Sequence, residues 1–112
     1  MIDSEKLINA VNKLIQFLNE VDSAVYYEQI NYLNFLIDLI KNKQYETFFV
    51  KANSSELWGG SGSIWESEYG MSEQQRQIFE NTLLDLLNLL KENNKMDKRA
   101  KSVFKILNRI DS

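Results

Sequence analysis

All four glycines of this chain lie between residues 59 and 70, and the chain contains no proline. Proline breaks helix interiors and glycine weakens them, so this distribution favours long uninterrupted helices on both sides of one irregular segment. We take that segment to be residues 57–70, which also hold both tryptophans. A loop is expected there because glycine permits positive φ and close backbone approach. The loop-forming residues are Gly59, Gly60, Gly62 and Gly70.

Apolar residues recur at spacings of three and four before this segment, as one face of a helix requires. Those between Leu7 and Val21 predict an amphipathic helix with Asp3 or Ser4 as its N-cap. The next segment, 24–42, is apolar nearly all the way round, which is typical of a helix in the centre of a bundle. Its three tyrosines are expected in the core or at its edge, with a ligand pocket as the alternative.

A short helix is expected over residues 44–53, followed by one more turn that Ser54 or Ser55 caps. Beyond the glycines, Ser72 and Gln75 have the spacing of a capping box, which marks the start of a long helix.

Two asparagines, Asn93 and Asn94, are expected to end that long helix in a left-handed turn, with Asn94 also the candidate cap of a terminal helix over 96–110. The pattern predicts an all-α fold: one domain, residues 1–112, built as an antiparallel bundle of four to five helices with a Gly/Trp-rich crossover loop.

The 112 residues include no histidine and no cysteine. Thiol nucleophiles, Ser-His-Asp triads and the usual zinc sites are therefore excluded, and we expect no catalysis, no cofactor and no metal. No apolar run approaches the length of a membrane span, and no basic-then-apolar leader opens the chain. A cytoplasmic protein that contacts no membrane is expected.

Charge is divided unevenly along the chain. Residues 91–112 carry seven basic and three acidic side chains, a net charge of +4. Because the whole chain has a net charge of −3, residues 1–90 carry −7. The basic residues Lys91, Lys95, Lys98, Lys105 and Arg109 are expected to share a solvated face. We expect no nucleic-acid binding there, because the aromatic residues that would stack on bases are not interleaved with them.

The glycine run 59–63 matches neither of two known catalytic patterns. A phosphate cradle would need a Gly-Lys-Ser/Thr ending or Gly-x-Gly-x-x-Gly spacing, and a nucleophile elbow would need a histidine base. Recognition is the interpretation that remains, because large aromatic side chains stand there among acids. The expected partner-binding residues are Trp58, Trp65, Tyr69, Glu56, Glu66 and Glu68.

Two alternatives stay open for this loop. The tryptophans can instead plug the end of the bundle, with the glycines letting the chain turn. The order of residues 64–69 also fits a short extended piece, even a small hairpin, in which Glu66 and Glu68 lie on one side. Such a pair can hold a hard cation or act as acid and base, although a solvated acidic rim is favoured.

The run Trp58–Ile64 resembles an aromatic-Gly-Gly-x-Gly-Ser-hydrophobic motif of uncharacterised small helical bacterial proteins. The likeness covers those seven residues and the helix-loop-helix order; in those proteins Asn-Asp often follows, where this chain has Trp65-Glu66. In size, acidity and lack of catalytic groups the chain also resembles immunity proteins that neutralise contact-dependent or polymorphic toxins.

That resemblance implies a cytosolic inhibitor of a cognate toxin domain such as a nuclease, acting as a monomer or weak dimer. A helical adaptor or homo-oligomerisation module is the alternative, and a carboxylate-dependent enzyme is a third. An acidic surface with aromatic anchors would complement the basic cleft of a toxin that acts on nucleic acid.

Overall fold

In the computed structural model, residues 2–59, 62–68 and 70–111 are described, the last three of them without side chains. Every regular element within these ranges is helical, which confirms the predicted all-α fold. The elements are α1 (Ser4–Asp22), α2 (Tyr27–Lys41), α3 (Tyr45–Ala52), the one-turn α4 (Ser55–Trp58), the 3-10 helix η1 (Trp65–Glu68), α5 (Glu73–Glu92) and α6 (Lys98–Asp111).

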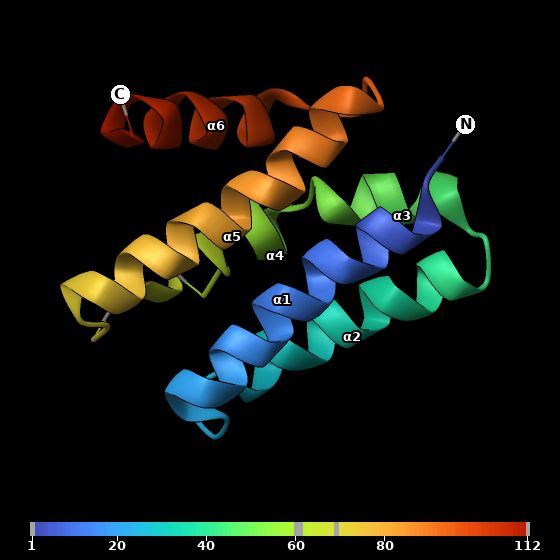
Figure 1. Ribbon diagram of the computed structural model, residues 1–112. Helices are drawn as coiled ribbons and strands as arrows, with labels where there is room; N and C mark the ends of the chain where they lie inside the picture. Colours follow the sequence, from blue (N-terminus) through green and yellow to red (C-terminus); the bar gives the residue numbers. More distant parts are fainter. Residues whose placement is uncertain (1, 60–61, 69, 112) are drawn as a thin grey trace.

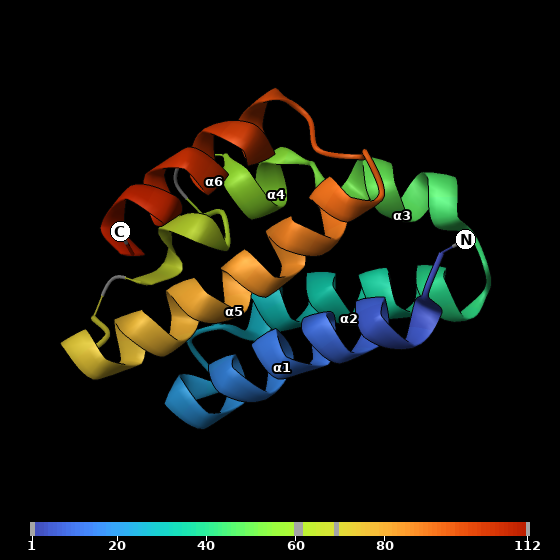
Figure 2. The same cartoon turned by 45° about the horizontal axis from the view of Figure 1, so that its top comes forward.

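The helices form a bundle in which α1 contacts both α2 and α5 (Figure 1). α2 runs antiparallel to α1, α5 runs back along α1, and α6 folds back beside α5 with α4 next to it (Figure 2). The expectation that the segment 24–42 occupies the centre is wrong. One face of α2 is open to solvent, where Tyr27 is 65% and Phe35 is 41% exposed.

Side-chain caps set where the helices begin. Asp3 accepts a hydrogen bond from the Lys6 amide (3.1 Å), as expected for the N-cap of α1. Ser72 and Gln75 form the predicted capping box at the start of α5, with bonds of 3.1 and 2.9 Å. α2 begins later than predicted, at Tyr27. The Asp22 carboxylate accepts hydrogen bonds from the Ala24 and Val25 amides, so these residues form a turn before the helix starts.

Two helices end in a left-handed residue other than glycine. Asn94 has φ 55°, and the amides of Asn94 and Lys95 donate to the Lys91 and Leu90 carbonyls, so α5 ends in a Schellman motif at one of the two predicted asparagines. α2 ends in the same motif. Lys43 has φ 58°, and the amides of Lys43 and Gln44 donate to the Ile40 and Leu39 carbonyls.

The terminal helix starts beyond its predicted cap. Asp97, rather than Asn94, accepts from the Ala100 amide (3.1 Å) and precedes the first helical residue, Lys98. The expected start at residue 96 is therefore wrong, because the Schellman turn holds Asn94 in the end of the preceding helix.

One core runs through the bundle. It contains apolar residues from every α-helix, and the rings of Phe17 on α1 and Phe79 on α5 stack across it with centroids 5.9 Å apart. Among the described residues, no helix is long and apolar enough to cross a membrane.

We predict that Lys43→Gly raises the free energy of unfolding by about 1 kcal/mol, because glycine adopts positive φ without the strain that a Cβ causes. Urea denaturation followed by far-UV circular dichroism measures the change. Asp85→Gly, at an exposed position inside α5, is the control and lowers the same free energy by about 1 kcal/mol. Equal destabilisation by both glycines would contradict a left-handed Lys43.

Candidate functional site

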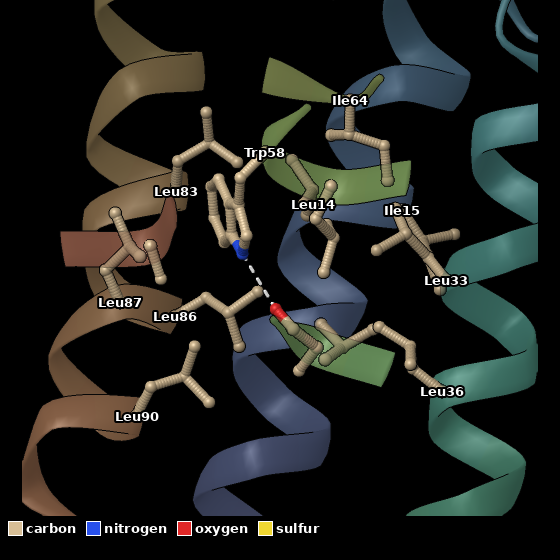
Figure 3. Close-up of a cluster of buried hydrophobic side chains, with 14 of the residues drawn as sticks. Leu14, Ile15, Leu33, Leu36, Trp58, Ile64, Leu83, Leu86, Leu87 and Leu90 are labelled. Carbon is tan, nitrogen blue, oxygen red and sulfur yellow. Dashed lines mark hydrogen bonds between the residues drawn. The ribbon is translucent and has the colours of Figure 1, made fainter. Parts of the chain in front are cut away.

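Trp58 lies inside the core rather than on a surface. Its side chain is only 4% exposed, and Figure 3 shows the indole among Leu83, Leu86 and Leu87 of α5. The indole Nε1 donates to the Ala52 carbonyl (2.7 Å), a group at the end of α3 that has no partner within its own helix. The expected partner-binding role of Trp58 is therefore corrected: it is the plug that the alternative interpretation described.

Three glycines meet distinct backbone requirements in this segment. A Cβ on Gly59 would come within 2.6 Å of the Ser55 carbonyl oxygen, so only glycine fits there without a shift. Gly62 and Gly70 have φ of 88° and 86°, the left-handed region that glycine enters freely. Gly60 lies outside the described residues.

The segment after Gly59 is packed and hydrogen-bonded. Ile64 is 1% exposed, and its amide donates to the Glu56 carbonyl (2.8 Å). The buried Ser63 hydroxyl donates to the Gly59 carbonyl (2.7 Å), and the Ser67 hydroxyl donates to the Ser63 carbonyl (2.9 Å). Where it is described, this segment is therefore part of the fold rather than a free loop.

Two side chains at the start of α2 hold the segment: that of the N-cap residue Tyr26 and that of Gln29. The Tyr26 hydroxyl donates to the Ser67 carbonyl (3.0 Å), and the Gln29 amide nitrogen donates to the Gly62 carbonyl (3.3 Å). Burial, and then the nearby Asp22 charge, raise the pKa of Tyr26. These contacts fix the loop against the helix that is open to solvent.

The expected extended piece is instead the 3-10 helix η1. Residues two apart in such a helix point about 120° away from each other, so Glu66 and Glu68 do not form the predicted same-side pair. Glu66 is exposed, while Glu68 and Trp65 are partly buried and Trp65 packs on the core. Tyr69 lies outside the described residues. In the described ranges, no group of three or more acids is placed to hold a metal ion.

Glu56, the remaining predicted residue, is exposed and belongs to a surface that sequence reasoning missed. A cavity of about 180 Å³ separates α2 from α4 and the loop. Its lining residues include two acids and no base: Glu28, Gln29, Tyr32, Glu56, Gly62 and Ile64. The cavity is therefore acidic on its sides and carries one aromatic ring.

Tyr32 is fixed in this cavity by its hydroxyl. It donates to the Lys51 carbonyl (2.6 Å) and accepts from the Ser54 hydroxyl (2.7 Å), whose oxygen also lies 3.2 Å from a Glu56 carboxylate oxygen. Burial chiefly raises the pKa of Tyr32 to about 12; the bond to Ser54 opposes this rise and the Glu56 charge adds to it.

One further aromatic residue continues this surface along α2: the ring centroids of Tyr32 and Phe35 are 6.0 Å apart, and Phe35 is 41% exposed. Tyr27, the first residue of α2, is 65% exposed about two turns from Phe35 on the open side of the helix. We call Tyr27, Glu28, Tyr32, Phe35 and Glu56 the α2 surface. Polar residues at 28, 31, 34 and 38 recur at helical spacing and were the signal that this helix has an open face.

The basic residues that were expected on one face come from two helices and the connection between them. Lys91 and Lys95 lie at the end of α5 and just beyond it, with their ammonium groups 5.1 Å from the Phe104 ring and 5.8 Å from the Phe49 ring. Lys98 and Lys105 are on α6. The side chain of Arg109 lies outside the description.

No protein-family model matches the chain, and searches of curated proteins and of solved structures give no match either.

We predict that Trp58→Phe lowers the free energy of unfolding by about 1–3 kcal/mol, because it leaves the Ala52 carbonyl buried without its donor. Trp65→Phe, the matched change at the partly buried tryptophan, lowers it by less than about 1 kcal/mol. Urea denaturation of both variants gives the comparison. A larger loss of stability in Trp65→Phe than in Trp58→Phe would contradict the structural role that we give to Trp58.

The second prediction for this site concerns pH. A folded-state pKa of about 12, above the ordinary value of 10.0, means that the stability contributed by neutral Tyr32 is present below pH 10 and is lost as the pH rises towards 12. Subtracting the tyrosinate absorbance of Tyr32→Phe from that of the unmodified protein isolates this titration. Tyr27→Phe, at an exposed tyrosine, is the control. A Tyr32 midpoint at the ordinary value would contradict the buried hydroxyl.

Proposed function

We propose that this protein is a non-catalytic binding protein whose α2 surface attaches to a basic surface of a protein partner. The observation that carries the proposal is the combination of exposed Tyr27 and Phe35 with the acidic cavity between Glu28 and Glu56. The partner class that fits is a toxin acting on nucleic acid, because its cleft must attract phosphates. The protein would then be an immunity protein, in keeping with the resemblance in size and acidity.

The aromatic residues would supply the binding energy. Interfaces concentrate their energy in a few large side chains, and removing one typically costs ~2 kcal/mol or more. Tyr27 and Phe35 are exposed here without a covering element, whereas Trp58 already has its partners inside the core. This difference is why we assign the anchors to α2 and not to the tryptophan segment.

The cavity has the chemistry to receive a lysine or arginine side chain of the partner. Glu28 and Glu56 line it and can pair with a cation, and Tyr32 contributes an aromatic side chain to the same lining. Its volume of about 180 Å³ suits a single side chain rather than a larger group. The acids would also speed encounter with a basic partner through long-range attraction.

Self-association is the second candidate, since Val25, Tyr27 and Phe35 are exposed apolar residues close together in sequence. A symmetric dimer through this face would place the same patch of both copies in contact. Glu28 and Glu56 of each copy would then face the other copy's acids, and like charges across an interface oppose binding. A basic heterologous partner is therefore favoured.

The experiment measures binding to the product of the neighbouring gene, because immunity genes lie beside their toxin genes. We predict that Phe35→Ala and Tyr27→Ala each raise the Kd at least about tenfold while leaving the far-UV spectrum unchanged. Glu28→Lys with Glu56→Lys slows association most strongly at low salt. Ile78→Ala, a similarly exposed apolar residue on α5, is the control and leaves the Kd unchanged.

Three outcomes would contradict the proposal. One is the absence of any complex with that gene product; another is a complex that all α2 variants keep. The third is concentration-dependent dimerisation, measured by sedimentation, that Phe35→Ala abolishes. That last result would favour the second candidate function, self-association through the same face.

A further inference from the structure

A second cavity, of about 270 Å³, lies in the corner between the end of α5 and the first half of α6. Its lining residues are Lys91, Asn94, Met96, Lys101, Phe104 and Lys105. We call it the α5–α6 pocket; Figure 2 shows the corner where α5 passes into α6. It takes no part in the α2 surface, with which it shares no residue.

The charge of the α5–α6 pocket opposes that of the whole chain. Three of its lining residues are lysines and none is acidic, although the chain has a net charge of −3. Lys91 comes from α5, whereas Lys101 and Lys105 come from α6, so packing of the two helices brings like charges towards one cavity. Like charges repel one another, and an anion bound between them would relieve that repulsion.

Apolar groups complete the lining. Phe104 and Met96 are partly buried and pack on the core, which leaves part of each available to the pocket. The Lys91 ammonium stands 5.1 Å from the centroid of the Phe104 ring. Cationic and apolar groups therefore meet within one cavity, as sites for organic anions require.

The connection that forms one wall is held in place by a buried asparagine. The Asn53 amide nitrogen donates to the Lys95 carbonyl (2.6 Å), and its amide oxygen accepts from the Asp97 amide (2.9 Å). Asn53 is 8% exposed, and the Schellman turn at Asn94 fixes the start of the same connection. The pocket is thus formed before any ligand arrives, which lowers the entropic cost of binding.

We propose that the α5–α6 pocket binds a small amphiphilic anion, namely one phosphate or carboxylate group carried on a flat apolar body. The anionic group would pair with Lys101 and Lys105, and the apolar body would lie against Phe104 and Met96. The volume suits a body of one or two fused rings. This site is independent of the proposed protein partner.

The test titrates the isotopically labelled full chain with 2-naphthyl phosphate and follows backbone amide shifts by NMR. Saturable shifts are expected at residues 94–105, with a Kd on the order of 1 mM or tighter. Lys101→Glu with Lys105→Glu weakens binding at least about tenfold. Lys6→Glu with Lys13→Glu changes the net charge equally in the groove between α1 and α5, and leaves the Kd within about threefold.

Two further probes separate the two halves of the ligand. Inorganic phosphate alone and 2-naphthyltrimethylammonium, which carries the same ring on a cation, should both bind at least about tenfold more weakly. Phe104→Leu keeps the apolar volume but removes the aromatic face, and it weakens naphthyl phosphate more than inorganic phosphate. Equal binding of the cation, equal loss in the Lys6 and Lys13 variant, or shifts that never saturate would each overturn the proposal.

Discussion

The structure depends on one side chain that satisfies two demands at once. Trp58 fills the space between α5 and the α1–α2 pair with an indole, and its Nε1 supplies the donor that the end of α3 lacks. The one-turn α4 ends at this residue, and the chain then turns at Gly59, where a Cβ would meet the Ser55 carbonyl. Burial of this tryptophan therefore fixes both the path of the chain and the position of the segment that follows.

That constraint decides which surfaces remain for recognition. With Trp58 and Ile64 inside the core and the segment bound to Tyr26 and Gln29, most of the loop's large side chains already have partners. Glu66 stays exposed and Glu68 is partly buried, while Glu56 on α4 lines the cavity beside α2. These contacts are the reason why our proposals place protein recognition on the α2 surface and a separate anion site in the α5–α6 pocket.

Much of the helical order was predictable from sequence because local rules determine it: the capping box at Ser72, a left-handed asparagine at the end of α5 and the apolar stripe of α1 lie where expected. The candidate site was less predictable. Whether a tryptophan beside glycines points inward depends on tertiary neighbours such as the Ala52 carbonyl, and nothing in the local sequence specifies that bond. The open face of α2 was hard to predict because it carries aromatic residues, and tyrosine and phenylalanine occur both in cores and at interfaces.

Native-state hydrogen exchange of the free protein tests the central claim, that the tryptophan segment is a packed part of the core. The amides of Gly59 and Ile64 donate to the Ser55 and Glu56 carbonyls at 2.8 Å each. They should exchange as slowly as the amides in the middle of α5, which open only with global unfolding. Exchange of both amides at the rate of an exposed loop would contradict the claim and return the tryptophan segment to the surface.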